Sequence, residues 1–267
     1  MRTLKELSDL KGRTVLITGG AGHLGQAFGH VLAEMGAGIA LADRNKDAAE
    51  RAAQNISTLH GVPCLGIGLD LACEEELKRL PQQVAAHFGG LDVLINNAGF
   101  VGTDKLTGWC VPFEEQSAET WRAATEVNMT APFFLTQAAT PWLRKHKRGS
   151  VINIASIYAF LGPDMRLYDG TSMGNPAAYA ASKGGLIQST RWLSTVLAPE
   201  IRVNCVSPGG IWRNQPESFV KAYEARTPMR RMGTEEDMMG AIAFLASDLS
   251  LYVTGQHIAV DGGWSAW

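Results

Sequence analysis

The chain has 267 residues, of which 46% are hydrophobic, and a formal net charge of -2 at pH 7. This length is ample for a large core and fits one α/β domain. The near-neutral charge leaves no basic excess to neutralise phosphates, so we expect no nucleic-acid partner. The charged first residues, 1–11, lack the apolar run of a signal peptide, and no stretch could span a membrane. We therefore expect a cytoplasmic protein without a membrane partner.

The cysteines and histidines predict no metal site and no disulfide framework. The four cysteines are scattered and form no C-x-x-C pair, which is typical of reduced thiols in an intracellular protein. The histidines likewise show no ligand spacing: His30, His60, His87 and His257.

Short apolar runs alternate with longer segments of helical period along the whole chain. The sequence predicts strands at 13–17, 38–42, 62–68, 91–95, 150–154, 201–206 and 257–260. It predicts helices at 22–35, 46–59, 74–88, 117–145, 176–197 and 234–246. Pro132 is expected to kink the longest helix, and Thr234 to Asp237 resembles a capping box. This alternation predicts a single domain over 1–267 with the doubly wound (Rossmann) α/β fold, in which about seven parallel strands carry helices on both faces.

A glycine-rich turn, Thr-Gly-Gly-Ala-Gly-His-Leu-Gly at 18–25, follows the first predicted strand. Gly20, Gly22 and Gly25 fit the pattern GxGxxG between a strand and a helix. Glycines at these places let the backbone approach a pyrophosphate, and the start of the next helix supplies N–H donors. We interpret the turn as the phosphate site of a dinucleotide.

Charged residues at the ends of the second and third strands bear on the type of dinucleotide. A carboxylate at Asp43 can accept both hydroxyls of an adenosine ribose and would repel a 2′-phosphate, which favours NAD(H) over NADP(H). Arg44 is the opposing signal, because its guanidinium could bind that phosphate. Asp70 is placed to meet the adenine edge.

Tyr179 and Lys183 stand four residues apart in a predicted helix and therefore point to the same side. A phenol has an unperturbed pKa of about 10. A nearby ammonium favours the phenolate and lowers that pKa. Such a pair can take a proton from an alcohol or give one to a carbonyl near neutral pH.

With these residues in view, the chain resembles the short-chain dehydrogenase/reductase family from about residue 10 to residue 263. The resemblance rests on TGGAGHLG at 18–25, NNAG at 96–99, VNMTAPFF at 127–134, NIAS at 153–156, YAASK at 179–183, RVNCVSPGG at 202–210 and VTGQHIAVDGG at 253–263.

The resemblance implies hydride transfer between NAD(H) and a secondary alcohol or ketone, by a homotetramer or dimer. Tyr179 would be the acid/base, Lys183 would lower its pKa and bind the nicotinamide ribose, and Ser156 would bond the substrate oxygen. Asn128 would hold a water that links Lys183 to solvent. The implied cofactor contacts are Gly19, Gly22, His23, Leu24, Gly25, Asp43, Arg44, Asp70, Leu71, Asn97, Ala98, Gly99, Tyr179, Lys183, Pro208, Gly209 and Ile211.

Two departures from the family pattern leave alternatives open. The glycines at 19, 22 and 25 also fit TGxxGxxG, a form that resembles the longer branch of the family acting on nucleotide sugars. One alternative is therefore an epimerase or dehydratase that uses bound NAD transiently, and another is a nucleotide-binding regulator without catalysis. A threonine expected after the PG turn is missing, and Trp212 to Gln215 stands there instead.

Two segments are expected to overhang the substrate: 163–174, which lengthens the spacing between Ser156 and Tyr179, and 212–226. Their polar side chains suit a sugar-like substrate, and Arg166 or Arg213 could bind a carboxylate or phosphate. Both segments and the ending VDGGWSAW resemble family members from bacterial surface-sugar pathways. Two tryptophans of that ending, Trp264 and Trp267, could pack on a neighbouring subunit or on their own core.

Overall fold

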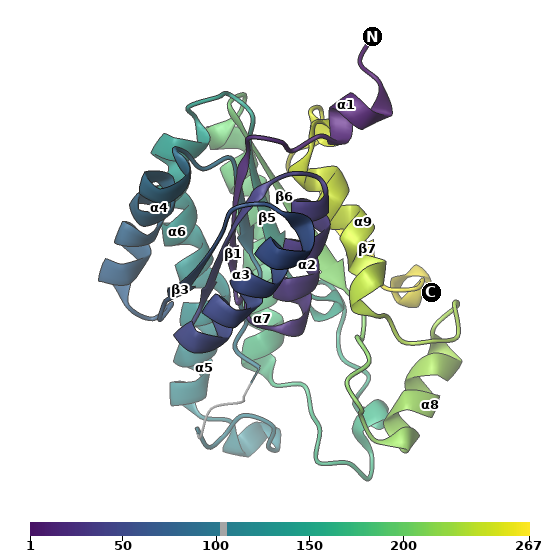
Figure 1. The fold of residues 1–267 in the computed structure, drawn as a ribbon. Coiled ribbons are helices and arrows are strands. Elements are labelled where there is room, and N and C mark those ends of the chain that lie inside the picture. The colour runs from purple at the N-terminus through teal and green to yellow at the C-terminus, as the bar shows by residue number, and fades with distance from the viewer. Residues whose placement is uncertain (102–105) are drawn as a thin grey trace.

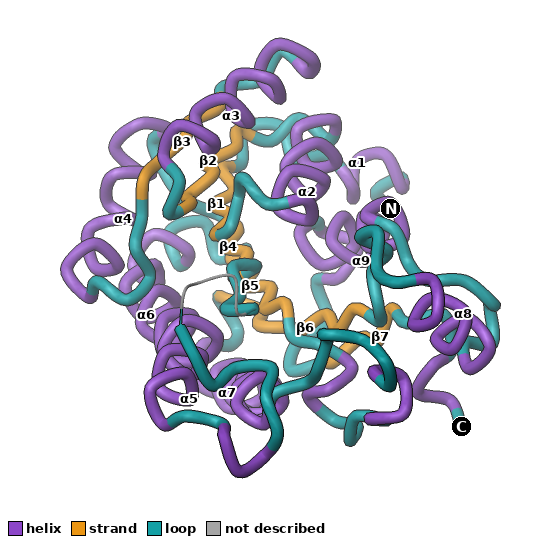
Figure 2. Tube along the Cα trace, turned by 90° about the horizontal axis from the view of Figure 1, so that it is seen from below, coloured by secondary structure: helices purple, strands orange, loops and turns teal. Residues whose placement is uncertain are grey.

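The computed structural model describes residues 1–101 and 106–267. Seven strands form one parallel sheet in the order β3-β2-β1-β4-β5-β6-β7 (Figures 1 and 2). They are β1 (Thr14–Thr18), β2 (Gly38–Asp43), β3 (Cys64–Gly68), β4 (Val93–Asn96), β5 (Gly149–Ile154), β6 (Ile201–Pro208) and β7 (His257–Val260). The predicted seven-stranded, doubly wound α/β sheet is confirmed.

Helices cover both faces of the sheet, as the view along it in Figure 2 shows. Apolar side chains of α2, α3 and α9 pack on one face, and those of α4, α6 and α7 pack on the other. The helices are α1 (Leu4–Ser8), α2 (His23–Glu34), α3 (Lys46–His60), α4 (Glu74–Phe88), α5 (Ala118–Thr125), α6 (Ala131–Leu143), α7 (Ala177–Leu197), α8 (Glu217–Arg226) and α9 (Glu235–Ala246). Among the described residues, no helix has both the length and the apolar character needed to cross a bilayer.

The helix ends follow local signals in the sequence. The Asn45 side chain caps α3 by accepting from the Ala48 N–H at 3.1 Å, and Gly61 ends that helix in the left-handed conformation at φ 68°. The predicted capping box is present, because Thr234 and Asp237 bond each other reciprocally at the start of α9.

The predicted helix 117–145 is interrupted by a π-helical turn. This turn, Glu126–Thr130, separates α5 from α6. We expected the break at Pro132, but that proline lies in the first turn of α6, after the π turn. A proline carries no N–H and cannot donate to the Asn128 carbonyl four residues before it, so the regular α-helical ladder cannot pass through this place.

The segment 212–226, expected as an overhanging loop, contains α8. A buried cluster of Leu167, Tyr168, Phe219, Tyr223 and Met232, here called the α8 cluster, packs α8 against the extra segment 163–174. The extra segment and α8 are therefore in contact although they lie far apart in the sequence. Trp264 stacks on Tyr223 with ring centroids 4.3 Å apart, so this tryptophan packs on its own chain.

Candidate active site

Two glycines of the turn between β1 and α2, Gly19 and Gly25, have no room for a side chain. A Cβ at Gly25 would lie 2.2 Å from the Gly19 carbonyl oxygen, and one at Gly19 would lie 2.8 Å from the Ala98 Cα. Gly19 also has a positive φ of 61°. Gly20 allows close packing against β2. A Cβ at this position would lie 2.7 Å from the Cβ of Leu41.

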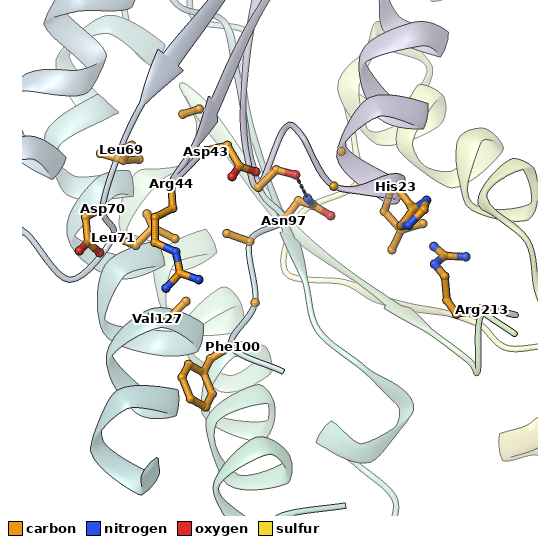
Figure 3. Close-up of a pocket in the computed structure, with 17 residues that line it drawn as sticks. His23, Asp43, Arg44, Leu69, Asp70, Leu71, Asn97, Phe100, Val127 and Arg213 are labelled. Carbon is orange, nitrogen blue, oxygen red and sulfur yellow. Dashed lines mark hydrogen bonds between the residues drawn. The ribbon is translucent and has the colours of Figure 1, made fainter. Parts of the chain in front are cut away.

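A cavity of about 470 Å³ opens beside this turn, at the carboxyl ends of β1 to β4 (Figure 3). It is lined by twelve predicted residues: Gly19, Gly22, His23, Leu24, Gly25, Asp43, Arg44, Asp70, Leu71, Asn97, Ala98 and Gly99. It is also lined by residues that we had not predicted for it: Ala42, Leu69, Phe100, Val127 and Arg213. We call this space the first cavity.

The Asp43 carboxylate is fixed at the edge of the first cavity. Its Oδ2 accepts from the Ala21 N–H at 3.1 Å, and its Oδ1 accepts from the Asn45 N–H at 3.0 Å. Arg44, the next residue, lines the same cavity (Figure 3). Asp43, which would repel a 2′-phosphate, and Arg44, which could bind one, therefore line the same cavity.

Asn97 joins the NNAG turn to the glycine turn. Its side-chain N–H groups donate to the carbonyl oxygen of Thr18 at 2.9 Å and to that of Gly19 at 3.1 Å. Figure 3 shows the second of these bonds. These bonds hold the ends of β1 and β4 at a constant separation and give the floor of the first cavity a fixed shape.

A second cavity of about 250 Å³ contains the reactive hydroxyls. Ser156, Tyr179 and Gly209 line it, together with five aromatic side chains, namely Trp109, Tyr158, Tyr168, Phe219 and Tyr223. The remaining described lining residues are Val101, Cys110, Ile157, Met173, Gly174, Asn175, Pro176, Gly210, Gln215 and Met232.

Ser156 and Tyr179 line this cavity together. Burial raises the pKa of the Tyr179 phenol above its ordinary value, and the Ser156 hydroxyl opposes that rise. That Lys183 lowers this pKa stays a prediction. Here burial outweighs the other influences, and the Lys183 ammonium donates to the Ile154 carbonyl oxygen at 2.7 Å.

The other two predicted catalytic residues, Lys183 and Asn128, lie together next to Gly99. A Cβ at Gly99, which lines the first cavity, would lie 3.6 Å from both Lys183 Nζ and Asn128 Oδ1. Asn128 is fully buried in the π turn. Its Oδ1 accepts from the Phe100 N–H at 2.7 Å, and its Nδ2 donates to the Ser182 hydroxyl at 3.1 Å.

The three residues predicted to border the nicotinamide, Pro208, Gly209 and Ile211, differ in whether they line a cavity. Gly209 lines the second cavity, whereas Pro208 and Ile211 line neither of the two cavities described above. Pro208 is the buried last residue of β6, and Ile211 pairs with Gly233. Pro208 and Ile211 were predicted to border the nicotinamide, and their contacts with it stay predictions.

The two arginines considered for substrate binding point elsewhere. Arg166 is held by Asp164 through bonds of 2.9 and 2.8 Å and does not line the second cavity. Arg213 lines the first cavity near His23 (Figure 3), where its guanidinium pairs with Glu235 at 2.8 Å. Within the described residues, no group of histidines, cysteines or carboxylates could hold a metal ion.

A family model described as enoyl-(acyl carrier protein) reductase matches residues 20–265. The chain belongs to the short-chain dehydrogenase/reductase family. A 3-oxoacyl-[acyl-carrier-protein] reductase from Thermotoga maritima is 33% identical over 95% of this chain and 98% of its own. The 5-keto-D-gluconate 5-reductase of Escherichia coli is 32% identical over 97% of this chain and 98% of its own.

A solved member of the family supports the same assignment. It is described as an NAD(P)-dependent gluconate 5-dehydrogenase from Beutenbergia cavernae with NADP bound at low occupancy. It is 33% identical, superposes with a TM-score of 0.85, and covers 98% of this chain and 100% of its own. The chain is thus an NAD(P)-dependent oxidoreductase of the short-chain dehydrogenase/reductase family.

The first cavity fits the dinucleotide of this family. The missing side chains at Gly19 and Gly25 leave backbone next to the start of α2, where a pyrophosphate can accept from N–H groups. The fixed Asp43 carboxylate offers two oxygens to ribose hydroxyls. Gly99 lines this cavity and lies next to the Lys183 ammonium.

Proposed function

We propose that the enzyme transfers a hydride between NAD(H) and a secondary alcohol or ketone of a polar, sugar-like molecule, with Tyr179 as the acid/base. The observation that carries this proposal is that Ser156 and Tyr179 line the same second cavity. This pair presents two hydroxyls to one substrate oxygen, within reach of the cavity that fits a dinucleotide.

Bound NAD(P) supplies or accepts the hydride. In the oxidation direction, Tyr179 takes the hydroxyl proton of the substrate, and in reduction it returns that proton to the carbonyl oxygen. The Ser156 hydroxyl donates to the same oxygen and stabilises the negative charge that develops there. Lys183 provides a cation one helical turn from Tyr179, and Asn128 holds the π turn against the NNAG strand end through Phe100.

NAD is proposed over NADP because the Asp43 carboxylate already accepts from two backbone N–H groups and cannot turn away from a 2′-phosphate. The relative from Beutenbergia cavernae is described with NADP, so the two cofactors must be compared directly. Arg44 is the residue that would favour NADP.

We propose further that residues 1–267 act as one cytoplasmic domain with its own substrate site, assembled as a homotetramer. All four cysteines are free, which suits a reducing compartment. Large apolar side chains are exposed on α5, α6 and α7, namely Trp121, Phe134, Trp192 and Val196. Such exposed groups on neighbouring helices suit burial between subunits.

The test combines cofactor binding with turnover. Thermal unfolding is measured with NAD⁺, NADH, NADP⁺ and NADPH, since a ligand that binds only the folded state raises its apparent stability. Absorbance of NADH is then followed with a panel of sugars, polyols and ketones. Tyr179→Phe is expected to lower kcat by about 10²–10⁴-fold, as loss of a general acid/base does. Tyr252→Phe, on an exposed residue, is the matched control.

The outcomes separate the proposal from its rivals. Substrate-dependent oxidation or reduction of the cofactor that requires Tyr179 supports it. Substrate conversion without net change in NADH would favour the epimerase, which the TGxxGxxG spacing suggests. Binding of NAD(H) with no conversion of any substrate would favour the regulator.

A further inference from the structure

The second cavity holds aromatic rings and neutral polar groups, and no described residue that lines it carries a formal charge. A carboxylate or phosphate in such a cavity would lose hydration without gaining an ionic partner, which is costly. The arginines that could have offered one are engaged elsewhere, Arg166 with Asp164 and Arg213 with Glu235. The lining therefore favours an uncharged substrate.

Two tyrosine hydroxyls share one hydrogen bond in the wall of this cavity. The Tyr158 and Tyr168 hydroxyl oxygens are 2.9 Å apart, and either hydroxyl can be the donor. The hydroxyl that accepts this bond keeps its own proton. Tyr168 can therefore accept from Tyr158 and present its own O–H to a bound molecule.

The pair has two hydroxyl protons and one hydrogen bond between them, which leaves one proton for the substrate. When Tyr168 accepts from Tyr158, its own O–H has no acceptor among the described residues. A hydroxyl proton that is shielded from water and has no acceptor is a group that a bound ligand can satisfy. Tyr168 lines the same cavity as Ser156 and Tyr179, so this proton is available to the molecule that occupies it.

The Tyr168 ring is held in place from two sides. It is 9% exposed, and its ring centroid lies 5.5 Å from that of Phe219 on α8. The Thr171 hydroxyl donates to the Tyr168 carbonyl oxygen at 2.8 Å, which fixes the backbone of the extra segment. A donor held this firmly discriminates between substrates better than a mobile one, because little freedom remains to be lost on binding.

We propose that Tyr168 is a specificity-determining hydrogen-bond donor, which selects uncharged substrates with a second oxygen close to the reacting carbon. This inference rests on the proposed function and names its substrate class: neutral hydroxyketones and vicinal diols rather than sugar acids. The small size of the cavity, about 250 Å³, keeps the two oxygens near each other.

The experiment compares 2-hydroxycyclohexanone with cyclohexanone, which lacks the second oxygen. Values of kcat/KM are measured with NADH for the wild type, for Tyr168→Phe and for Tyr252→Phe, an exposed tyrosine used as the control. The wild type is expected to prefer the hydroxyketone, because a site built to bond a hydroxyl rejects the analogue without it. Tyr168→Phe should reduce that preference by about tenfold or more, mainly through KM, which corresponds to one lost hydrogen bond.

Several results would overturn the inference while leaving the proposed function in place. These are an unchanged preference in Tyr168→Phe, an equal loss of activity on both ketones, or a higher kcat/KM of the wild type for 5-keto-D-gluconate than for neutral L-sorbose. If the wild type reduces no ketone and oxidises no alcohol, the proposed function and this inference fall together. A preference that falls in Tyr168→Phe and stays in Tyr252→Phe supports the assignment.

Discussion

The Lys183 ammonium donates to the carbonyl oxygen of Ile154 at 2.7 Å, inside a protein region from which water is excluded. Burial lowers the pKa of Lys183 from its ordinary 10.5 to about 8. The ammonium is therefore charged at neutral pH but close to losing its proton. A cation that the proposed chemistry needs is thus maintained at a cost to the folded state.

The first prediction concerns the pH dependence of folding. Between about pH 8 and pH 10.5 the unfolded chain keeps the Lys183 proton while the folded chain has lost it. More protons are then bound in the unfolded state, so this group makes the free energy of unfolding rise with pH, by up to about 1.4 kcal/mol per pH unit. Denaturant unfolding of the wild type and Lys183→Met across this range should show the rise in their difference. A difference that stays flat would contradict it.

The second prediction concerns the glycine turn. Gly25→Ala places a Cβ 2.2 Å from the Gly19 carbonyl oxygen, a backbone atom that cannot move aside. We expect a lower melting temperature and loss of the stabilisation by NAD(H). Gly240→Ala is the matched control, because no atom beyond its own helix lies within 4 Å. It should stabilise the exposed face of α9 by about 1 kcal/mol. Equal effects of the two substitutions would refute the steric argument.

The third prediction concerns the choice between NAD(H) and NADP(H). Asp43→Ser removes the carboxylate that is proposed to bind the ribose and leaves Arg44 in the same cavity. The ratio of the dissociation constants for NADPH and NADH should fall by about tenfold or more, equivalent to about 1.4 kcal/mol. Titration calorimetry gives both constants. Asp47→Ser, which removes the same charge from an exposed position in α3, should leave the ratio unchanged.

The fourth prediction concerns an ion cluster far from both cavities. Asp248, with 1% of its side chain exposed, accepts from Arg2 and Arg13 at 2.5 Å and from Arg148 at 3.5 Å. Asp248→Ala leaves Arg13 largely buried without its carboxylate, and loss of one partner of a buried pair costs about 3–5 kcal/mol. The urea midpoint should fall with the m-value unchanged. Glu74→Ala, in the exposed pair with Lys78, should leave the midpoint unchanged.

The first cavity could be predicted because each of its parts is a local signal at a strand end. Parallel topology brings the carboxyl ends of β1, β2 and β4 to one edge, so the glycine turn, Asp43 and Asn97 had to meet there. The helical spacing placed Tyr179 and Lys183 on one side of α7, and the resemblance to the family implied their roles. The pKa values of these two groups could not be predicted from the sequence, because they depend on how deeply the surrounding chain buries each group.

The second cavity was less accessible to sequence reasoning. Tyr158 and Tyr168 meet only because the extra segment folds back over the end of β5, which no local periodicity indicates. Arg213 seemed suited to the substrate, yet the loop after β6 carries it to the first cavity and to Glu235. Its position was set by packing between distant segments. The segment 217–226 was predicted as part of an overhanging loop and forms α8 instead.

Because of the α8 cluster, a substitution in the extra segment 163–174 changes the packing of α8, and a substitution in α8 changes the packing of the extra segment. Tyr168 comes from the extra segment and Phe219 and Tyr223 come from α8, yet they share one buried interface. A segment borrowed from a relative would meet unmatched partners unless α8 came with it. Substrate range in this lineage is therefore expected to evolve by paired substitutions, and a chimera should express as folded enzyme only when 163–174 and 212–232 are exchanged together.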